Sequence, residues 1–600
     1  MTLRTLALLT LLLLPAALVR AEEEAAKSAE TAAIAEITLE IADAEDPPSD
    51  FPFGPKSRNL RELLATVRRA AADPKVDAVL FRPKSYGVGW ARLLEVRDGL
   101  KALRASGKKV FVYQESMSAP DLALLSLADR ISMPESGSVM LPGLAVESLY
   151  MKRLLDKLRI RFDVIHIGEY KSAGESFVRE TMSDELKQSL DPILDEMFES
   201  MVQAIAEGRR IPADAVKAAI DKGILSAREA QAAGLIDRVE YADQFRAGME
   251  AFFPGKKVTV AAYERKQGPK IDANNPMAAL MQVMNLLSGA GREKPPAGPK
   301  IAVIYCTGTI VSGTSQYGWT GEVAAMGSET IVAAIDEAAR NDEVKAIVLR
   351  INSPGGSGLA SDIIWRASAR AKERKPVLSS MGDVAASGGY YIAANSTLIV
   401  AEPQTITGSI GVVGMIPNLE GFLQWVGMDP QRLTRGKRAA ALLTTQGFGD
   451  EDREIFRAYM KAFYDDFVAK VAAGRGRTPA EIEPLARGRI WSGRKARELG
   501  LVDELGGLER AIALAREKGG IPADAAFHIL ESPQRAGPFE MLDQLFSSQA
   551  SAEFAALAAL PGMRTLLDRI AVARLAAVDR ICCIAPELEA FASPLRARVR

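Results

Sequence analysis

A serine stands between small residues in the stretch MGDVAASGGY, which runs from Met381 to Tyr390. Residues 376–380 before it have strand character, and the alanine-rich residues 390–394 after it are helical in composition. Ser387 is therefore expected at a strand-to-helix turn, where small neighbours admit a substrate backbone and the helix N-terminus favours developing negative charge. Such a position suits a nucleophile, although a serine there can also simply cap the helix.

Histidine, the usual base that activates a serine, is scarce, because the chain holds only His166 and His528. His166 lies in the apolar run 164–167, where we expect a packed residue of a strand. Lysine is then the natural base, as in the Ser-Lys variants of the catalytic triad. The lysine has to be neutral, and burial in apolar surroundings favours that form.

Acyl transfer also needs hydrogen-bond donors for the oxyanion, commonly two backbone N–H groups. A predicted strand over 347–351 runs into a turn that contains Gly355 and Gly356, whose N–H groups we expect to be unencumbered. Alone, this sequence would be an ordinary tight turn, but beside Ser387 we favour an oxyanion hole. Asp383 is interpreted as a cap or turn residue and is left out of the site.

Composition narrows the classes of protein to consider. The 600 residues are 48% hydrophobic and 25% charged, which is typical of a globular protein with several domain-sized units. The net charge of −1 gives no electrostatic footprint for nucleic acid. Three cysteines are too few for a disulfide framework, and the sequence has no CxxC or HExxH spacing, so we expect no metal and no cofactor.

Changes in composition divide the chain. Arg4 precedes an apolar run over 6–19, so residues 1–21 are interpreted as a signal peptide, or else as a short retained anchor. Residues 266–299 are rich in Gly, Pro, Asn and Lys and are interpreted as a linker. We therefore expect two α/β domains, over 34–263 and 300–519, and a mostly helical C-terminal extension over 520–600.

The two domains are copies of one fold. VDAVLFR at 76–82 matches VKAIVLR at 344–350, and further matches recur at an offset near 268 residues. Helical patterns alternate with short apolar strands, which predicts largely parallel sheets. The first copy has lost the glycine pair, and Pro120 falls in the place of the serine. Instead it carries Lys171 in a polar, glycine-bearing loop that follows an apolar strand.

Four motifs together resemble the signal peptide peptidase A family in its long, tandem-domain type. They are NSPGG at 352–356, AASGGY at 385–390, TGSIG at 407–411 and YKSA at 170–173. The resemblance covers about residues 34–520. It implies two ClpP/crotonase-like domains and a serine protease with a Ser-Lys dyad. Within that site it implies the following roles: Ser387 as nucleophile, Lys171 as general base, Gly355 with Gly356 in the oxyanion hole, and Ser409 as the residue that orients the base.

The resemblance also implies a substrate class and a setting. The substrates would be signal peptides already released from preproteins, and other short apolar peptides. The protein would be exported and would work on the periplasmic side of the inner membrane, either soluble or associated with the membrane surface. It would assemble as a homotetramer, and no nucleic-acid partner is expected.

Three alternatives stay open. Lys437 has the spacing from Ser387 that the short, single-domain type uses, but it lies among arginines that are more typical of a solvated basic face. A crotonase-type acyl-CoA enzyme would share the fold and the oxyanion hole. A non-catalytic, membrane-associated scaffold is also consistent with a first copy that has lost its serine.

Overall fold

The computed structural model describes residues 31–41, Glu45, 59–263, 297–317, 323–533 and 582–584. The predicted leader at 1–21 lies outside the described residues, as do most of the linker and most of the extension. None of the helices in the described part of the chain combines the length and the apolar character that a membrane span requires.

The first copy is built on a six-stranded parallel sheet in the order β10-β1-β2-β3-β5-β9. Its strands are β1 (Thr31–Ile41), β2 (Ala78–Tyr86), β3 (Lys109–Tyr113), β5 (Arg130–Met133), β9 (Arg238–Val239) and β10 (Lys257–Ala262). The three-stranded sheet β4-β6-β8 comprises β4 (Ser116–Ser118), β6 (Ser138–Met140) and β8 (Ile224–Ser226). The parallel sheet confirms the α/β interpretation, because helices alternate with its strands along the chain.

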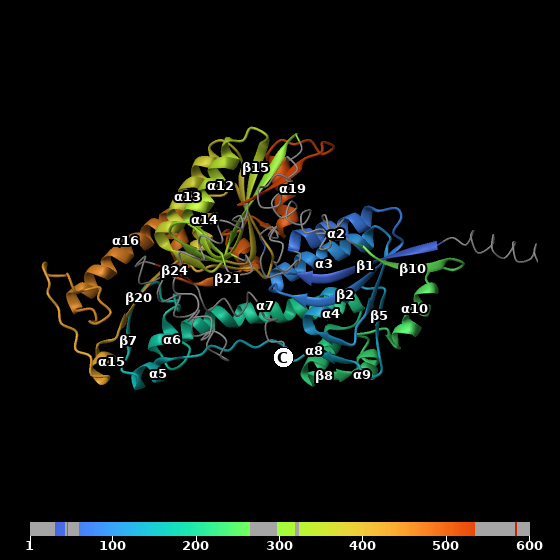
Figure 1. The fold of residues 1–600 in the computed structure, drawn as a ribbon, viewed down its shortest axis with the longest axis horizontal. Helices are drawn as coiled ribbons and strands as arrows, with labels where there is room; N and C mark the ends of the chain where they lie inside the picture. The colour runs from blue at the N-terminus through green and yellow to red at the C-terminus, as the bar shows by residue number, and fades with distance from the viewer. Residues whose placement is uncertain are drawn as a thin grey trace, which may run out of the picture.

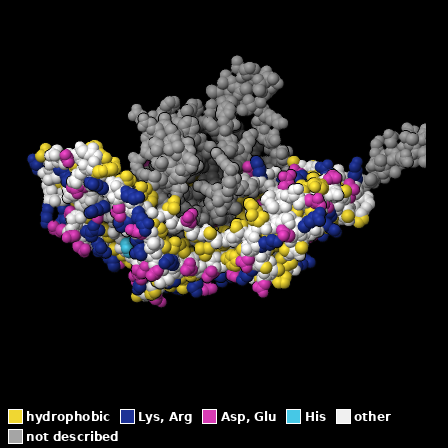
Figure 2. Space-filling view, turned by 90° about the horizontal axis from the view of Figure 1, so that it is seen from below, with side chains coloured by type: hydrophobic (Ala, Val, Ile, Leu, Met, Phe, Trp, Pro, Cys, Tyr) yellow, Lys and Arg dark blue, Asp and Glu magenta, His cyan; other side chains and the backbone are white. Residues whose placement is uncertain are grey.

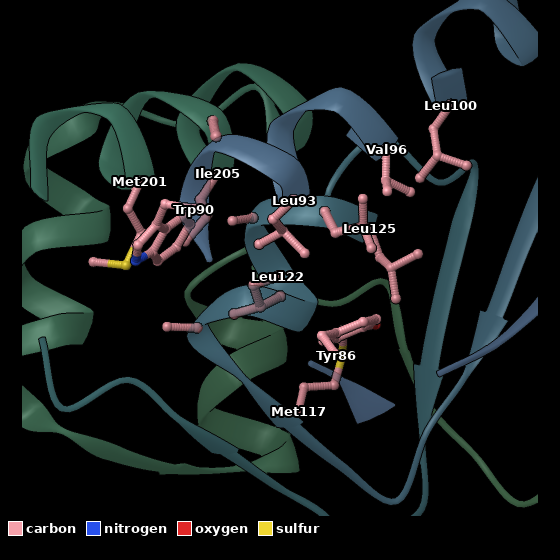
Figure 3. Packing of buried hydrophobic residues seen from close by; sticks show 14 of the residues in the cluster. Tyr86, Trp90, Leu93, Val96, Leu100, Met117, Leu122, Leu125, Met201 and Ile205 are labelled. Atoms are coloured by element: carbon pink, nitrogen blue, oxygen red, sulfur yellow. The ribbon is translucent and has the colours of Figure 1, made fainter. Parts of the chain in front are cut away.

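Three helices of the first copy pack against one another within its core. These are α3 (Trp90–Ala105), α4 (Ala119–Leu125) and the long α7 (Asp184–Arg209). Trp90 and Leu93 of α3 lie over Leu122 of α4, and Met201 and Ile205 of α7 close this cluster from one side (Figure 3). The other helices are α2 (Leu60–Ala72), α5 (Lys152–Lys157), α6 (Glu175–Val178), α8 (Ala213–Lys222), α9 (Ala227–Ala232) and α10 (Ala242–Glu250).

The second copy repeats this plan. Its main sheet has the order β21-β19-β17-β15-β11-β23; β18 also pairs with β17, and β22 pairs with the other edge of β18. The strands are β11 (Lys300–Thr307), β15 (Val344–Ser353), β17 (Val377–Ala386), β18 (Leu398–Ala401), β19 (Ile406–Gly408), β21 (Ile490–Ser492), β22 (Glu504–Leu505) and β23 (His528–Ser532). The helices are α12 (Ser328–Arg340), α13 (Gly358–Lys372), α14 (Gly388–Ala393), α15 (Glu420–Trp425), α16 (Asp450–Arg475), α17 (Pro479–Ile482), α18 (Gly493–Glu498) and α19 (Leu508–Lys518).

Two details of the repeat differ from the sequence prediction. Strand β23 pairs in parallel with β11, as β10 pairs with β1, so the second copy reaches Ser532; the described residues of the extension contain the strands β23 and β24 and no helix. The starts of β3 and β17 are 268 residues apart, which puts Ala119, and not Pro120, opposite Ser387. The first copy lacks the serine with either alignment.

A third sheet joins the copies, in the order β13-β14-β12-β16-β24-β20-β7. Its strands are β7 (Arg161–Ile167), β12 (Thr309–Val311), β13 (Gln316–Tyr317), β14 (Val323–Gly327), β16 (Gly355–Ser357), β20 (Val412–Asn418) and β24 (Cys582–Ile584). Only β7 comes from the first copy, and it pairs antiparallel with β20 along its whole length. This pairing carries the loop after β7 into the second copy.

The copies lie side by side, and α7 of the first extends beneath β21 of the second (Figure 1). The core is shared as well, because Val384 and Ile406 of the second copy belong to the same buried cluster as α3 and α7. On the face in Figure 2, basic and acidic side chains are intermixed, in keeping with the net charge of −1.

Candidate active site

Ser387 occupies the turn between β17 and α14. Its backbone has φ 56° and ψ −114°, a conformation that residues other than glycine rarely adopt. The turn is held because the Ser387 N–H donates to the Gly408 carbonyl at 2.8 Å. Space beside it is tight, since a Cβ on Gly388 would lie 3.2 Å from the Cα of Gly355. The strained turn therefore presents the Ser387 hydroxyl next to the glycine segment of β16.

Lys171 reaches this turn from the first copy, in the loop that follows β7. Its Nζ lies 2.7 Å from Ser387 Oγ, 2.9 Å from Ser409 Oγ and 3.2 Å from the Ser409 carbonyl oxygen. Lys171 is 2% exposed, and the two serines are fully buried. Burial disfavours an ammonium and so favours the neutral amine, which is the form that can accept a proton from a hydroxyl.

The backbone conformation and a backbone hydrogen bond hold Ser409 in place. It follows β19 in a left-handed conformation with φ 50°, and its N–H donates to the Arg489 carbonyl at 2.7 Å. The same segment of the second copy contacts the lysine loop, because the Tyr170 N–H donates to the Arg487 carbonyl at 3.0 Å. The guanidinium of Arg489 lies 5.0 Å from the centre of the Tyr170 ring, a cation–π contact.

The segment from Arg487 to Arg489 was missed by the sequence analysis. A signal was available, because it directly precedes the repeat match at Trp491 and contains a glycine. Gly488 has φ +80°, and a Cβ there would lie 2.5 Å from the Lys171 backbone nitrogen and 2.6 Å from the Lys171 Cβ. Gly488 thus lets the two copies approach closely at the lysine.

Replacing Gly488 by alanine should displace Lys171 and reduce kcat/KM by roughly 10²-fold, because a shift of about 1 Å in a catalytic group costs that much. A matched control is Gly107→Ala, since Gly107 has φ +87° and nothing within 4 Å of its added Cβ. Both variants carry the backbone strain, and only Gly488→Ala moves the lysine. Peptidase assays on the two proteins test this, and equal activities would contradict it.

The glycine segment differs from expectation in one respect. The Gly355 N–H is not unencumbered, because it donates to the buried Ser353 Oγ at 3.1 Å. Gly355 has φ 103°, which glycine adopts without strain. A second N–H is available at Gly388, which begins α14 and so has no acceptor within that helix. Gly355 and Gly388 are in contact, whereas Gly356 lies further along β16 against Ile310.

Asp383 is a cap, as interpreted from the sequence, but it caps a helix of the other copy. Its carboxylate accepts the Gly89 N–H at 2.8 Å and the Arg92 N–H at 3.0 Å, at the start of α3. It also pairs with the Arg92 guanidinium, which is buried. The strand that ends at Ser387 is thereby tied to the first copy four residues before the serine.

A second buried arginine, Arg350 of β15, also forms ion pairs between the two copies. It pairs with Glu45 and, at 2.6 Å, with Glu95 of α3. Burial raises the pKa of Glu95 above its usual value, and the charge of Arg350 opposes this rise. Burial would lower the pKa of Arg350, but the charges of Glu45 and Glu95 outweigh it and raise that pKa. The two copies are thus joined by an ionic cluster that water does not reach.

The remaining candidates lie away from these contacts. Lys437 has a largely exposed side chain and pairs with Glu451 at 2.7 Å. His166 does lie in a strand, but the expectation that it is packed was wrong, because its ring is exposed and contacts the Gly168 carbonyl oxygen. Across the described ranges, no group of three or more His, Cys, Asp or Glu residues is placed to hold a metal ion.

The model for peptidase family S49 matches residues 102–253 and 369–521, one segment in each copy. The chain is 30% identical over 480 residues to the chloroplastic serine protease SPPA of Arabidopsis thaliana, covering 79% of this chain and 68% of that protein. It is 32% identical over 475 residues to Protease 4 of Salmonella typhi, covering 78% of this chain and 74% of that protein. Among solved structures, a ClpP1 mutant from Listeria monocytogenes is similar with a TM-score of 0.23 at 15% sequence identity. The match covers 35% of this chain and 94% of the ClpP1 chain.

Both repeats match the family, and the matches to the two relatives, over 480 and 475 residues, are too long to lie within one copy. This assignment decides against an acyl-CoA enzyme and against a scaffold without activity. The chain belongs to peptidase family S49, a family of serine proteases.

Proposed function

We propose that the protein is an endopeptidase in which Ser387 is the nucleophile and Lys171 the general base. The observation that carries the proposal is the 2.7 Å contact between Lys171 Nζ and Ser387 Oγ. The two residues are 216 positions apart and come from different copies, so this contact depends on the packing of the whole molecule. Both are buried, which is the environment that a neutral amine requires.

In the first half of the proposed reaction, the amine of Lys171 takes the Ser387 hydroxyl proton while Oγ attacks a peptide carbonyl carbon. The N–H groups of Gly355 and Gly388 donate to the resulting oxyanion, and for this Gly355 exchanges its bond to Ser353 for one to the substrate. The protonated Lys171 then gives its proton to the leaving amine as the C–N bond breaks, which leaves an acyl ester on Ser387.

In the second half, Lys171 accepts a proton from water as the water oxygen attacks the ester. Collapse of this intermediate releases the new carboxylic acid and returns the proton to Ser387. Ser409 holds the amine in position throughout, through its hydroxyl at 2.9 Å and its carbonyl oxygen at 3.2 Å.

We propose signal peptides released from preproteins, and other short apolar peptides, as the substrates. The sequence resemblance and the export signal inferred at residues 1–21 support this class. We further propose that the protein works as a homotetramer on the periplasmic side of the inner membrane, at its surface. The apolar side chains of Trp425, Met428 and Leu433, in and after α15, are exposed. They are suited to contact a membrane surface or another subunit.

A serine-reactive acylating probe tests the site, and a synthetic signal peptide tests the substrate. We expect the probe to label the wild-type protein and Ser379→Ala, a buried serine of the same strand, but not Ser387→Ala. We expect the free signal peptide to be cleaved and the same sequence within a folded preprotein to be spared. Equal labelling of the Ser387→Ala variant would exclude the nucleophile, and labelling without cleavage of signal peptides would exclude only the substrate class.

A further inference from the structure

The strand β24 comes from the far C-terminal end of the chain and lies beside the glycine segment of the site. It pairs antiparallel with β16, with Ile584 opposite Gly355, Cys583 opposite Gly356 and Cys582 opposite Ser357. On its other edge, Cys582 pairs antiparallel with Val413 of β20. These three residues thus fill the gap between the two strands that flank the site.

This position is one that the main chain of an extended peptide would take. Without β24, the facing edges of β16 and β20 would offer backbone N–H and C=O groups to an added strand. The register places Ile584 opposite Gly355, whose backbone abuts the turn of Ser387 and Gly388. The segment also lies against α14, the helix whose N-terminus begins at that turn.

The sequence of the segment suits such a site. Residues 581–586 read ICCIAP, which are small or apolar side chains without a charge. This is the chemistry proposed above for the substrates.

We propose that residues 582–584 are an internal competitor that occupies the peptide-binding edge of β16 and is displaced when a substrate binds. The proposal rests on the proposed function of the same site. Displacement breaks no covalent bond, because it exchanges the backbone pairing of this strand for that of the substrate. An occupied fraction of the protein cannot bind peptide, so the apparent KM is raised in proportion while kcat is unchanged.

The test uses the full-length protein with Cys583→Pro, which removes a backbone N–H at the centre of the strand and fixes φ. Cys583→Ala is the matched control, because it removes the thiol and keeps the pairing. We expect Cys583→Pro to lower KM for a short apolar peptide by roughly tenfold at unchanged kcat, and Cys583→Ala to behave as wild type. An unchanged KM in Cys583→Pro would overturn the proposal.

Two further measurements separate this proposal from the proposed function. Amide hydrogen exchange at residues 355–357 should be slow in the wild type and faster in Cys583→Pro, whether or not the protein cleaves peptides. A peptide with the sequence of residues 580–586 should inhibit Cys583→Pro competitively. Unaltered exchange would overturn the proposal. The proposal would also be overturned if the wild type lost the tail beyond residue 584 and the Ser387→Ala variant kept it. The strand would then be a substrate and not a retained competitor.

Discussion

Replacing Lys171 by alanine should reduce kcat/KM toward a short apolar peptide by about 10³-fold, the usual contribution of a general base. The Lys171 amine is within 2.7 Å of Ser387 Oγ, and alanine leaves no group there to take the proton. The fold should survive, because the substitution removes a buried amine whose burial carries a desolvation cost. Steady-state kinetics with a fluorogenic peptide, together with a thermal unfolding curve, would measure both effects.

Lys437→Ala is the matched control, because it removes the one other lysine that the sequence offered as the base. Lys437 pairs with Glu451 at the surface, so its loss should change activity little. The double variant Lys171→Ala/Ser387→Ala should be no worse than Ser387→Ala alone, since residues that act as a unit lose their effect together. Full activity in Lys171→Ala with none in Lys437→Ala would reverse the assignment of the base.

Much of the fold follows from local patterns in the sequence. The predicted strand over 347–351 lies within β15, because apolar patterns and turn residues act over a few positions. The repeat was visible for the same reason, since matching strands such as those at 76–82 and 344–350 conserve their buried side chains. The strand character of residues 376–380 and the helical composition of residues 390–394 also placed Ser387 at a strand-to-helix turn.

Local sequence patterns did not predict the contacts that complete the site. The pairing of β7 with β20 joins residues about 250 positions apart, and no local signal sets its register. The approach of Gly488 to Lys171 and the pairing of Cys582–Ile584 with β16 are of the same kind. The bond from Gly355 to Ser353 was also missed, because a glycine pair in a sequence does not show whether its N–H groups are already engaged.

A dyad divided between two copies works only while the copies keep their relative position, and the buried ionic cluster is one contact that fixes it. Arg350 is fully buried in the second copy and pairs with two carboxylates of the first, Glu45 and Glu95. Arg350→Met should lower the free energy of unfolding by about 3–5 kcal/mol, because it leaves buried carboxylates without their partner. Arg370→Met, which breaks an exposed pair with Asp336, should cost under about 1 kcal/mol. Urea unfolding of the two variants gives the comparison.

The loss caused by Arg350→Met should also depend on pH. The pKa of Glu95 is already raised by burial, and without the opposing charge of Arg350 it should rise further. A carboxyl whose pKa is raised in the folded state binds its proton more tightly there than in the unfolded chain, so stability falls as the pH rises from the unfolded pKa toward the folded one. The variant should therefore lose less at about pH 5 than at about pH 8, and adding Glu95→Gln should recover part of the stability at about pH 8. A loss that is equal at both pH values and unaffected by Glu95→Gln would mean that packing, and not the charge of Arg350, joins the copies at this point.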